Sequence, residues 1–325
     1  MRIAVVGAGA IGGFIGAMLS KAGEDVTLVA RGAHLRAMSE HGIRIKGSLG
    51  EFVTHPKVTD DPTTLRGVDL VILTLKAHSL IGIAPTLASM IGPSTSIISA
   101  QNGIPWWYFC RHGGEFDGLH LEALDPGRTL SRSFPPERTI GCVIYCSTIV
   151  SEPGVIQHLE GTRFAIGEPD GSRSERCHDI AQTFIRAGLR CPIRSNIRHD
   201  IWVKLLGSVA FNPISALSRA TLLELVRCPE TRDLSVQIMT EAETIAKRLG
   251  IDVAITKEQR LAGAEQVGNH KTSMLQDIEA GRPLEWESII GVLVELANKL
   301  NLSVPHIRAV AACTKLLSQS LTRAA

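Results

Sequence analysis

A glycine-rich turn between two hydrophobic segments constrains the fold of this chain most strongly. Residues 2–6 form an apolar run, and an apolar helical pattern continues from the turn to residue 22. This order of strand, G-x-G-x-x-G turn and helix is typical of a βαβ unit, in which helix N–H groups bind phosphates. It predicts a dinucleotide site, the alternative being a turn with only a packing role. The predicted site consists of Gly7, Ala8, Gly9, Ala10, Ile11 and Gly12.

The end of the next expected strand, residues 25–30, favours NADP(H) over NAD(H). An NAD site places Asp or Glu near this position to bind the ribose hydroxyls, whereas this chain has Arg31, followed by His34 and Arg36. A guanidinium attracts a 2′-phosphate, and no carboxylate repels it here. We therefore expect Arg31 to bind NADP(H), unless the segment is only a solvated basic turn.

Length and composition limit the classes of protein to which the chain can belong. Its 325 residues exceed one typical domain, so two domains are expected. A formal net charge of +2 argues against nucleic-acid binding, and no apolar stretch reaches the length of a membrane span. Seven cysteines without a C-x-x-C pair fit buried thiols in a reducing compartment. The first strand leaves no room for a signal peptide, so we expect a cytoplasmic protein.

Residues 1–196 are expected to form the NADP-binding domain. Short β-rich runs alternate with helical segments there, which predicts an α/β fold with a Rossmann-type, doubly wound parallel sheet. One helix is expected over residues 174–187. The later strands are expected over residues 68–75, 95–99, 139–149, 154–159 and 163–166.

Residues 197–325 are expected to form an all-helical substrate and catalytic domain. Long stretches there have helical periodicity and few strand signals. A spare apolar helix face permits a homodimer. The helices are expected over residues 200–218, 231–249, 257–280, 284–300 and 305–321.

A long connection, residues 103–138, contains the aromatic run Pro105-Trp106-Trp107-Tyr108-Phe109. Structureless connections of this length are uncommon in compact domains and are often functional. The run therefore predicts either a lid or pocket wall, or a plain hydrophobic anchor.

Two polar residues follow expected strands of the first domain, where the carboxyl ends of strands gather the reacting groups in open α/β sheets. Lys76 ends the run over residues 71–75, and Asn102 follows the strand over 95–99. The amide of Asn102 could bind nicotinamide or ribose, but Asn-Gly also favours a turn by itself. Lys76 is either a site residue or a surface lysine.

One apolar helix of the second domain carries a polar stripe. Lys204, Ser208 and Asn212 recur at intervals of four, so they lie on one face of a helix that is otherwise apolar enough to be buried. A buried lysine is costly unless it is paired or functional, and desolvation moves it towards proton transfer. The alternative is a lysine that reaches solvent, with a capping Asn before Pro213.

A second set of polar residues lies between Ser273 and Glu285. Gly281-Arg282-Pro283 is expected to end one helix, and Glu285 is expected in the first turn of the next, where the helix dipole favours its charge. Glu285 is therefore either a helix-start residue or a partner for Lys204.

These pieces together resemble the ketopantoate reductases (2-dehydropantoate 2-reductases) over almost the whole chain. The matching motifs besides the glycine turn are Thr74-Leu75-Lys76-Ala77, Gln101-Asn102-Gly103, Trp202-Val203-Lys204-Leu205, Asn212-Pro213, and Ser273-Met274-Leu275-Gln276-Asp277 running on to Glu285. The resemblance implies reduction of 2-dehydropantoate to (R)-pantoate with NADPH, in pantothenate and coenzyme A biosynthesis. It also implies a site in the cleft between a Rossmann domain and a helical domain.

The resemblance also implies roles for individual residues. Lys204 would be the general acid that protonates the ketone oxygen, and Glu285 would bind the substrate hydroxyl and lie close to the cofactor. Asn212 and Ser273 would bind polar ends of the substrate, with Ser208 also on the substrate side. Lys76 and Asn102 would lie beside the nicotinamide ribose and help to place Lys204, and no metal is implied.

Some residues depart from the family pattern. Ser208 stands where the family often has Asn, Trp286-Glu287 stands where Ile-Asp is usual, and the connection over residues 103–138 is longer than in short members. These departures leave two alternatives open beside 2-dehydropantoate reduction. One is a reductase of another, branched or bulkier 2-oxo acid, and the other is a non-catalytic NADP(H)-binding protein, against which the presence of both Lys204 and Glu285 argues.

Overall fold

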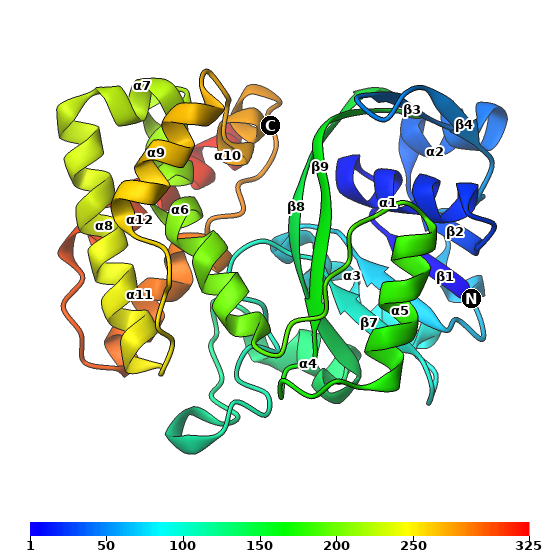
Figure 1. Cartoon of the computed structure of the whole chain (residues 1–325), viewed down its shortest axis with the longest axis horizontal. Helices are drawn as coiled ribbons and strands as arrows, with labels where there is room; N and C mark the ends of the chain where they lie inside the picture. The colour runs from blue at the N-terminus through cyan, green and yellow to red at the C-terminus, as the bar shows by residue number, and fades with distance from the viewer. Residues whose placement is uncertain (325) are drawn as a thin grey trace. The chain divides into compact units, whose positions relative to one another are not determined.

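The computed structural model describes residues 1–324 and divides the chain into two compact units. The first unit comprises Met1–Gln101, Trp107–Leu119 and Gly127–Ile197. The second comprises Asn102–Trp106, His120–Pro126 and the residues from Arg198 onwards. The expected fold class, a doubly wound α/β sheet followed by helices, is confirmed (Figure 1).

The first unit contains one nine-stranded sheet in the order β4-β3-β9-β8-β7-β6-β1-β2-β5. The strands β5, β2, β1, β6, β7 and β8 lie side by side in the Rossmann order, whereas β3 and β4, which come between β2 and β5 in the chain, lie at the opposite edge beyond β9. The strands are β1 (Arg2–Val6), β2 (Asp25–Val29), β3 (Ile43–Gly47), β4 (Phe52–Thr54), β5 (Lys57–Thr59), β6 (Leu70–Leu73), β7 (Ser96–Ser99), β8 (Thr139–Glu152) and β9 (Val155–Gly167).

The sheet is mixed, whereas the sequence predicted a parallel one. β8 and β9 form a long antiparallel hairpin, and β3 pairs antiparallel with β4. The expected strands over 154–159 and 163–166 are parts of the single strand β9, which passes through Gly161 at a φ of +74°. β3, β4 and β5 were not predicted, because they are short and only partly buried.

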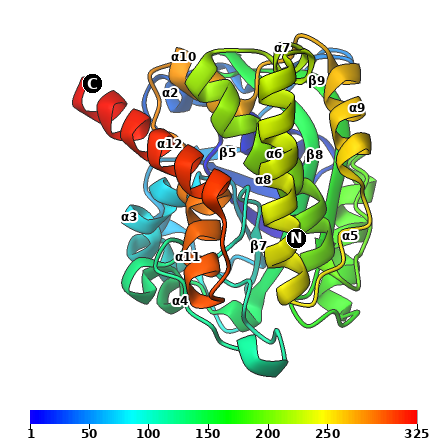
Figure 2. The same ribbon diagram turned by 90° about the vertical axis from the view of Figure 1, so that its left-hand side faces the viewer.

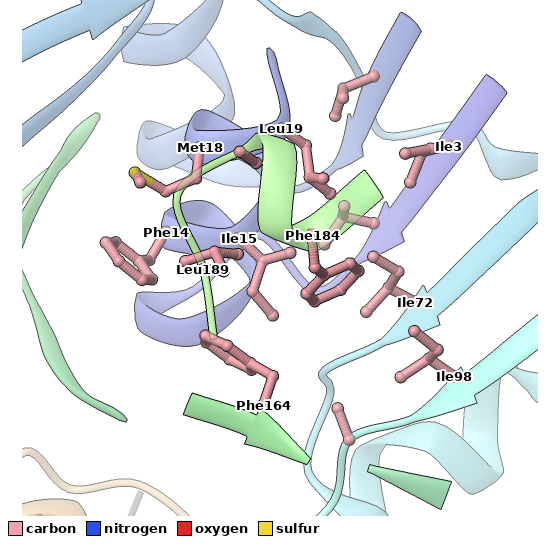
Figure 3. Packing of buried hydrophobic residues seen from close by; sticks show 14 of the residues in the cluster. Ile3, Phe14, Ile15, Met18, Leu19, Ile72, Ile98, Phe164, Phe184 and Leu189 are labelled. Carbon is pink, nitrogen blue, oxygen red and sulfur yellow. The ribbon is translucent and has the colours of Figure 1, made fainter. Parts of the chain in front are cut away.

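Helices cover the sheet of the first unit, and α1 packs against β2, β8 and β3. Figure 3 shows the resulting core, where Phe14 and Ile15 of α1 lie among side chains of the strands and Phe184 of α5. The helices, apart from short 3₁₀ turns, are α1 (Ala10–Lys21), α2 (Gly32–His41), α3 (Ala77–Leu87), α4 (Thr129–Ser133) and α5 (Glu175–Arg186).

The second unit is helical, and α8 packs against α11 and α12 (Figure 2). Two expectations for it are wrong: residues 257–280 form two helices separated at Gly268, and the helix expected from 284 begins at Glu287 with a π-helical turn. The elements are α6 (Ile197–Ser218), α7 (Leu222–Arg227), α8 (Pro229–Arg248), α9 (Lys257–Val267), α10 (Ser273–Glu279), the π turn η6 (Glu287–Gly291), α11 (Val292–Lys299) and α12 (Pro305–Ala324).

The expectation that no apolar stretch reaches the length of a membrane span is wrong for α6, which is long and apolar enough by length and composition alone. However, 61% of its most apolar window is buried inside the protein, and Trp202, Leu206 and Val209 are fully enclosed. These features are those of a core helix.

The aromatic run of the long connection acts as a hydrophobic anchor. Trp107, Tyr108 and Phe109 are buried in the first unit, and a Cβ on Gly141 of β8 would lie 2.5 Å from the ring of Trp107. This corresponds to the second of the two alternatives for residues 103–138. The connection is also not structureless, because it contains α4 and three 3₁₀ turns.

Candidate active site

The expected cofactor residues follow strands that end at the same edge of the sheet. β7, β6, β1 and β2 are adjacent and parallel, with Val6 paired to both Val29 and Leu73, and Leu73 paired to Ser99. The glycine turn, Arg31, Lys76 and Gln101 therefore all come directly after the carboxyl ends of neighbouring strands. This is where ligands bind in open α/β sheets.

The glycine turn leaves peptide groups for an anion. Gly7 has a φ of +96°, and its N–H and that of Ala8 donate to the carbonyl of Val29 at 3.1 and 3.2 Å. The first intrahelical bond of α1 runs from Gly13 to Gly9, so the N–H groups of residues 10–12 have no partner within the helix. A Cβ on Gly9 would have nothing within 4 Å. The turn thus fits a pyrophosphate.

Arg31 and His34 of the basic cluster differ in what they can offer a phosphate. Arg31 is exposed and precedes α2 with an extended backbone. The Nδ1 of His34 accepts from the N–H of Gly154 at 2.9 Å, and burial lowers the pKa of this ring. His34 is therefore neutral at pH 7, and the positive charge beside the turn comes from the arginines.

Two residues without a predicted role hold this edge together. Thr74 donates its hydroxyl to the carbonyls of Gly7 at 2.7 Å and Val6 at 3.0 Å. Gln101 donates its amide to the carbonyls of Leu73 at 2.9 Å and Leu75 at 3.2 Å. Both lie in motifs that were noted in the sequence, but only the structure shows that their side chains bind main-chain oxygens.

Lys76 lies at the start of α3, with a half-buried side chain and an extended backbone. It follows β6 by three residues, at the edge that carries the glycine turn. Its position is consistent with a cofactor role.

In the second unit, Lys204 is bound to Asn102. The ammonium of Lys204 donates to the side-chain oxygen of Asn102 at 2.6 Å. Lys204, Ser208 and Asn212 are each partly exposed, whereas their neighbours in α6 are mostly buried, as the spacing predicted. The hydroxyl of Ser208 donates back to the carbonyl of Lys204 at 3.3 Å. The helix therefore presents an oriented ammonium on a polar stripe of an otherwise apolar helix.

The segment from Ser273 to Glu285 is organised by a buried aspartate. Asp277 accepts from the side chain of Arg282 at 3.1 Å, and its carbonyl accepts from the N–H of Arg282 at 2.8 Å. These bonds close the turn after α10. Ser273, at the start of α10, is exposed.

Glu285 does not lie in the first turn of a helix, as the sequence had suggested. It is in an irregular segment two residues before η6, and only 8% of its surface is exposed. A buried carboxylate needs polar partners, so burial makes Glu285 a stronger site candidate than a helix-start residue would be.

The two departures beside Glu285 pack within the protein. A Cβ on Gly291 would lie 2.8 Å from the ring of Trp286, so the indole covers its own helix. Glu287 is half-buried, and burial raises the pKa of its carboxyl. Among the described residues, no group of three or more His, Cys, Asp or Glu is arranged to hold a metal.

Models of two domains match the chain. The Ketopantoate reductase PanE/ApbA model matches residues 3–171, and the Ketopantoate reductase PanE/ApbA C-terminal model matches residues 196–318. The chain belongs to the ketopantoate reductase family. It is an oxidoreductase of this NADPH-using family.

Individual relatives agree with this assignment over the full length. The chain is 43% identical to a 2-dehydropantoate 2-reductase of Mesorhizobium japonicum, covering 98% of both chains. A crystal structure from Ralstonia solanacearum, named only provisionally as a ketopantoate reductase, is 35% identical, covers 98% of both chains and has a TM-score of 0.93. A D-mandelate dehydrogenase solved with NADH and anilino(oxo)acetate shares the fold at 21% identity, with a TM-score of 0.84.

Proposed function

We propose that this protein reduces 2-dehydropantoate to (R)-pantoate with NADPH. The observation that carries the proposal is the hydrogen bond from Lys204 to Asn102, in a member of a family named for this reduction. This bond holds a proton donor in a fixed direction on the surface of α6. The step belongs to the synthesis of pantothenate and coenzyme A.

Lys204 acts as the general acid in this reaction. The bound NADPH supplies a hydride to the carbonyl carbon, which places negative charge on the ketone oxygen. The ammonium of Lys204 neutralises this charge and donates its proton to the oxygen. Asn102 accepts another Nζ proton and so keeps the ammonium oriented. The buried carboxylate of Glu285 accepts a hydrogen bond from the substrate hydroxyl.

The remaining site residues have binding roles in this proposal. Asn212, Ser208 and Ser273 bind the polar ends of the 2-oxo acid. The backbone of residues 7–12 binds the pyrophosphate, Arg31 the 2′-phosphate, and Lys76 the ribose. Residues 1–196 are thus the cofactor domain and residues 197–325 the substrate domain. Asn102 is the exception, because it lies in the first range of the sequence but binds Lys204 of the second.

One observation favours a different 2-oxo acid as the substrate. The family often has Asn where this chain has Ser208, and the Ser208 hydroxyl donates to the helix backbone. The site then has one fewer side-chain donor for the substrate than an Asn would give. A branched or bulkier, less polar 2-oxo acid is therefore the second candidate.

NADPH oxidation by the purified protein, followed with a panel of 2-oxo acids, tests both candidates. Lys204→Ala should lower kcat for the preferred acid by about 10²–10⁴-fold, the usual contribution of a general acid, without weakening NADPH binding. Lys257→Ala, which removes another lysine of the second unit, should leave kcat unchanged. Turnover of only a bulkier acid supports the second candidate. Tight NADPH binding without any turnover identifies a non-catalytic binding protein.

The homodimer and the cytoplasmic location remain predictions. The mass of the protein in solution tests the first, and fractionation of the cells tests the second.

A further inference from the structure

The loop that carries Asn102 is fastened to the π-helical turn η6. The N–H of Ile104 donates to the carbonyl of Ser288 at 2.9 Å. Gly103 lies directly on the same group: it has a φ of +80°, and a Cβ built there would be 2.0 Å from the carbonyl oxygen of Ser288. Only glycine allows this approach. All of these residues belong to the second unit.

The same helix holds the returning part of the long connection. Glu295, in α11 directly after η6, accepts the N–H groups of Glu122 at 3.0 Å and Ala123 at 2.8 Å. Residues 102–104 and 122–123 are therefore both fastened to the continuous helix over residues 287–299. Glu285 stands two residues before that helix.

We propose that η6 positions the general acid: the main-chain carbonyl of Ser288, with Gly103 packed on it, fixes Asn102, and Asn102 orients Lys204. Ser288 is then a positioning residue that acts through its backbone. π-helical turns occur as single turns inside α-helices, often at functional sites, which agrees with this role. The helix that begins two residues after Glu285 thereby also fixes Lys204, through the loop. This inference rests on the function proposed for Lys204.

Gly103→Ala tests whether the contact between the loop and η6 positions Asn102. The Cβ requires the loop or η6 to move by roughly 1 Å to restore a contact of 3.0 Å. Misplacement on this scale costs on the order of 10²-fold in rate. Gly103→Ala should therefore lower kcat by about 100-fold while the KM for NADPH stays within about twofold. Gly113→Ala is the matched control, because Gly113 has a φ of +79° but nothing within 4 Å of its Cβ position.

A double substitution distinguishes positioning from general damage. If Gly103 acts through Asn102, Gly103→Ala should add little to the loss caused by Asn102→Ala. Both variants should also move the basic limb of the kcat pH profile to lower pH, since Asn102→Ala removes, and Gly103→Ala displaces, the oxygen that stabilises the charged ammonium. Losses that multiply in the double variant, or an unchanged pH profile, overturn the proposal.

Two further variants separate the carbonyl of Ser288 from its hydroxyl. Ser288 is 2% exposed, and its hydroxyl has no hydrogen-bond partner among residues 1–324. Ser288→Ala should keep kcat within about threefold and should not lower the melting temperature, because it removes an unsatisfied group. A loss as large as that of Gly103→Ala overturns the backbone role. Ile104→Pro removes the N–H donor and should lower kcat, and it replaces Gly103→Ala if the latter does not fold.

Chemical labelling of lysines gives a readout that needs no turnover. The rate at which a small acylating reagent modifies Lys204 at fixed pH, measured by mass spectrometry against Lys257, should rise equally in Gly103→Ala and Asn102→Ala and stay unchanged in Gly113→Ala. An unchanged rate in Gly103→Ala overturns the positioning proposal. Absence of turnover in the unmodified protein instead overturns the proposed function, and the labelling still decides whether η6 positions Lys204.

Discussion

Gly12→Ala should destabilise this protein, although alanine inside a helix is ordinarily more stable than glycine. Gly12 lies in the first turn of α1, where a Cβ would be 2.3 Å from both the carbonyl oxygen of Gly7 and the hydroxyl of Thr74. The hydroxyl can rotate, but only by giving up its bonds to Val6 and Gly7. The carbonyl is part of the turn and cannot move without it.

The size of the effect follows from these contacts. Alanine gains about 1 kcal/mol in helix propensity over glycine. Overpacking costs about 1–3 kcal/mol, and the single hydroxyl proton of Thr74, shared between its two carbonyl acceptors, contributes about 1 kcal/mol. We therefore expect a net loss of about 1–3 kcal/mol in the free energy of unfolding. At roughly 2–4 °C for each kcal/mol, the melting temperature should fall by several degrees.

Gly9→Ala is the matched control for this prediction. Gly9 has a φ of −72°, and its Cβ position has nothing within 4 Å, so alanine fits the protein alone. Gly9→Ala should keep the melting temperature within a few degrees yet weaken NADPH binding at least tenfold, because the methyl occupies the space that the pyrophosphate needs. Thermal unfolding and NADPH titration measure both effects. A Gly12→Ala protein as stable as the parent, or a Gly9→Ala protein with unchanged NADPH affinity, would refute this reading of the turn.

Two other predictions concern charge. Arg31→Ala should raise the KM for NADPH at least tenfold but barely change that for NADH, whereas equal effects on both would show that Arg31 does not bind the 2′-phosphate. Burial raises the pKa of the Cys146 and Cys177 thiols to about 12 from 9.0, so the folded protein keeps protons that the unfolded chain loses. Stability should therefore be unaffected by these thiols below pH 9 and decline as the pH rises from about 9 to about 12, and denaturant unfolding of Cys177→Ala should show a shallower decline.

The sequence predicted the elements whose residues are uniformly apolar. β1 and β6 are buried along most of their length and are marked by apolar runs, and the buried strand β7 is marked by its two central isoleucines. β3 to β5 lack that pattern because they are at the edges or partly exposed. The start of the helix after Glu285 was predicted wrongly. The turn before it is closed by the bond between the side chains of Arg282 and Asp277, and helix propensities contain no information about such a bond.

The burial of the cysteines also could not be predicted from the sequence. All seven are free thiols, as their spacing indicated, but only Cys142, Cys177 and Cys191 are buried, whereas Cys228 and Cys313 are exposed. Spacing excludes a disulfide framework without reporting which face of a helix or strand a thiol occupies.

The site residues were predicted where polar residues interrupt apolar patterns, as Lys204 does in α6. Thr74, Gln101 and Ser288 were not, because they act on main-chain atoms of distant residues: Thr74 on Gly7, Gln101 on Leu73, and Ser288 through its own carbonyl on Ile104. A main-chain partner leaves no trace in composition or periodicity, so such residues become visible only once the fold brings the partners together.

Gln101 and Asn102 are adjacent in sequence but have different roles, one at the cofactor edge of the sheet and one beside the proposed general acid. Gln101 is held by main-chain oxygens at the edge of the sheet that carries the glycine turn, and Asn102 is held by Lys204 in the helical unit. One peptide bond therefore joins a residue that supports the cofactor edge to a residue that orients the proposed acid. Because their partners differ, substitutions at these neighbours should differ in kind: loss of the Gln101 amide acts on NADPH affinity, and loss of the Asn102 amide acts on proton transfer and hence on kcat.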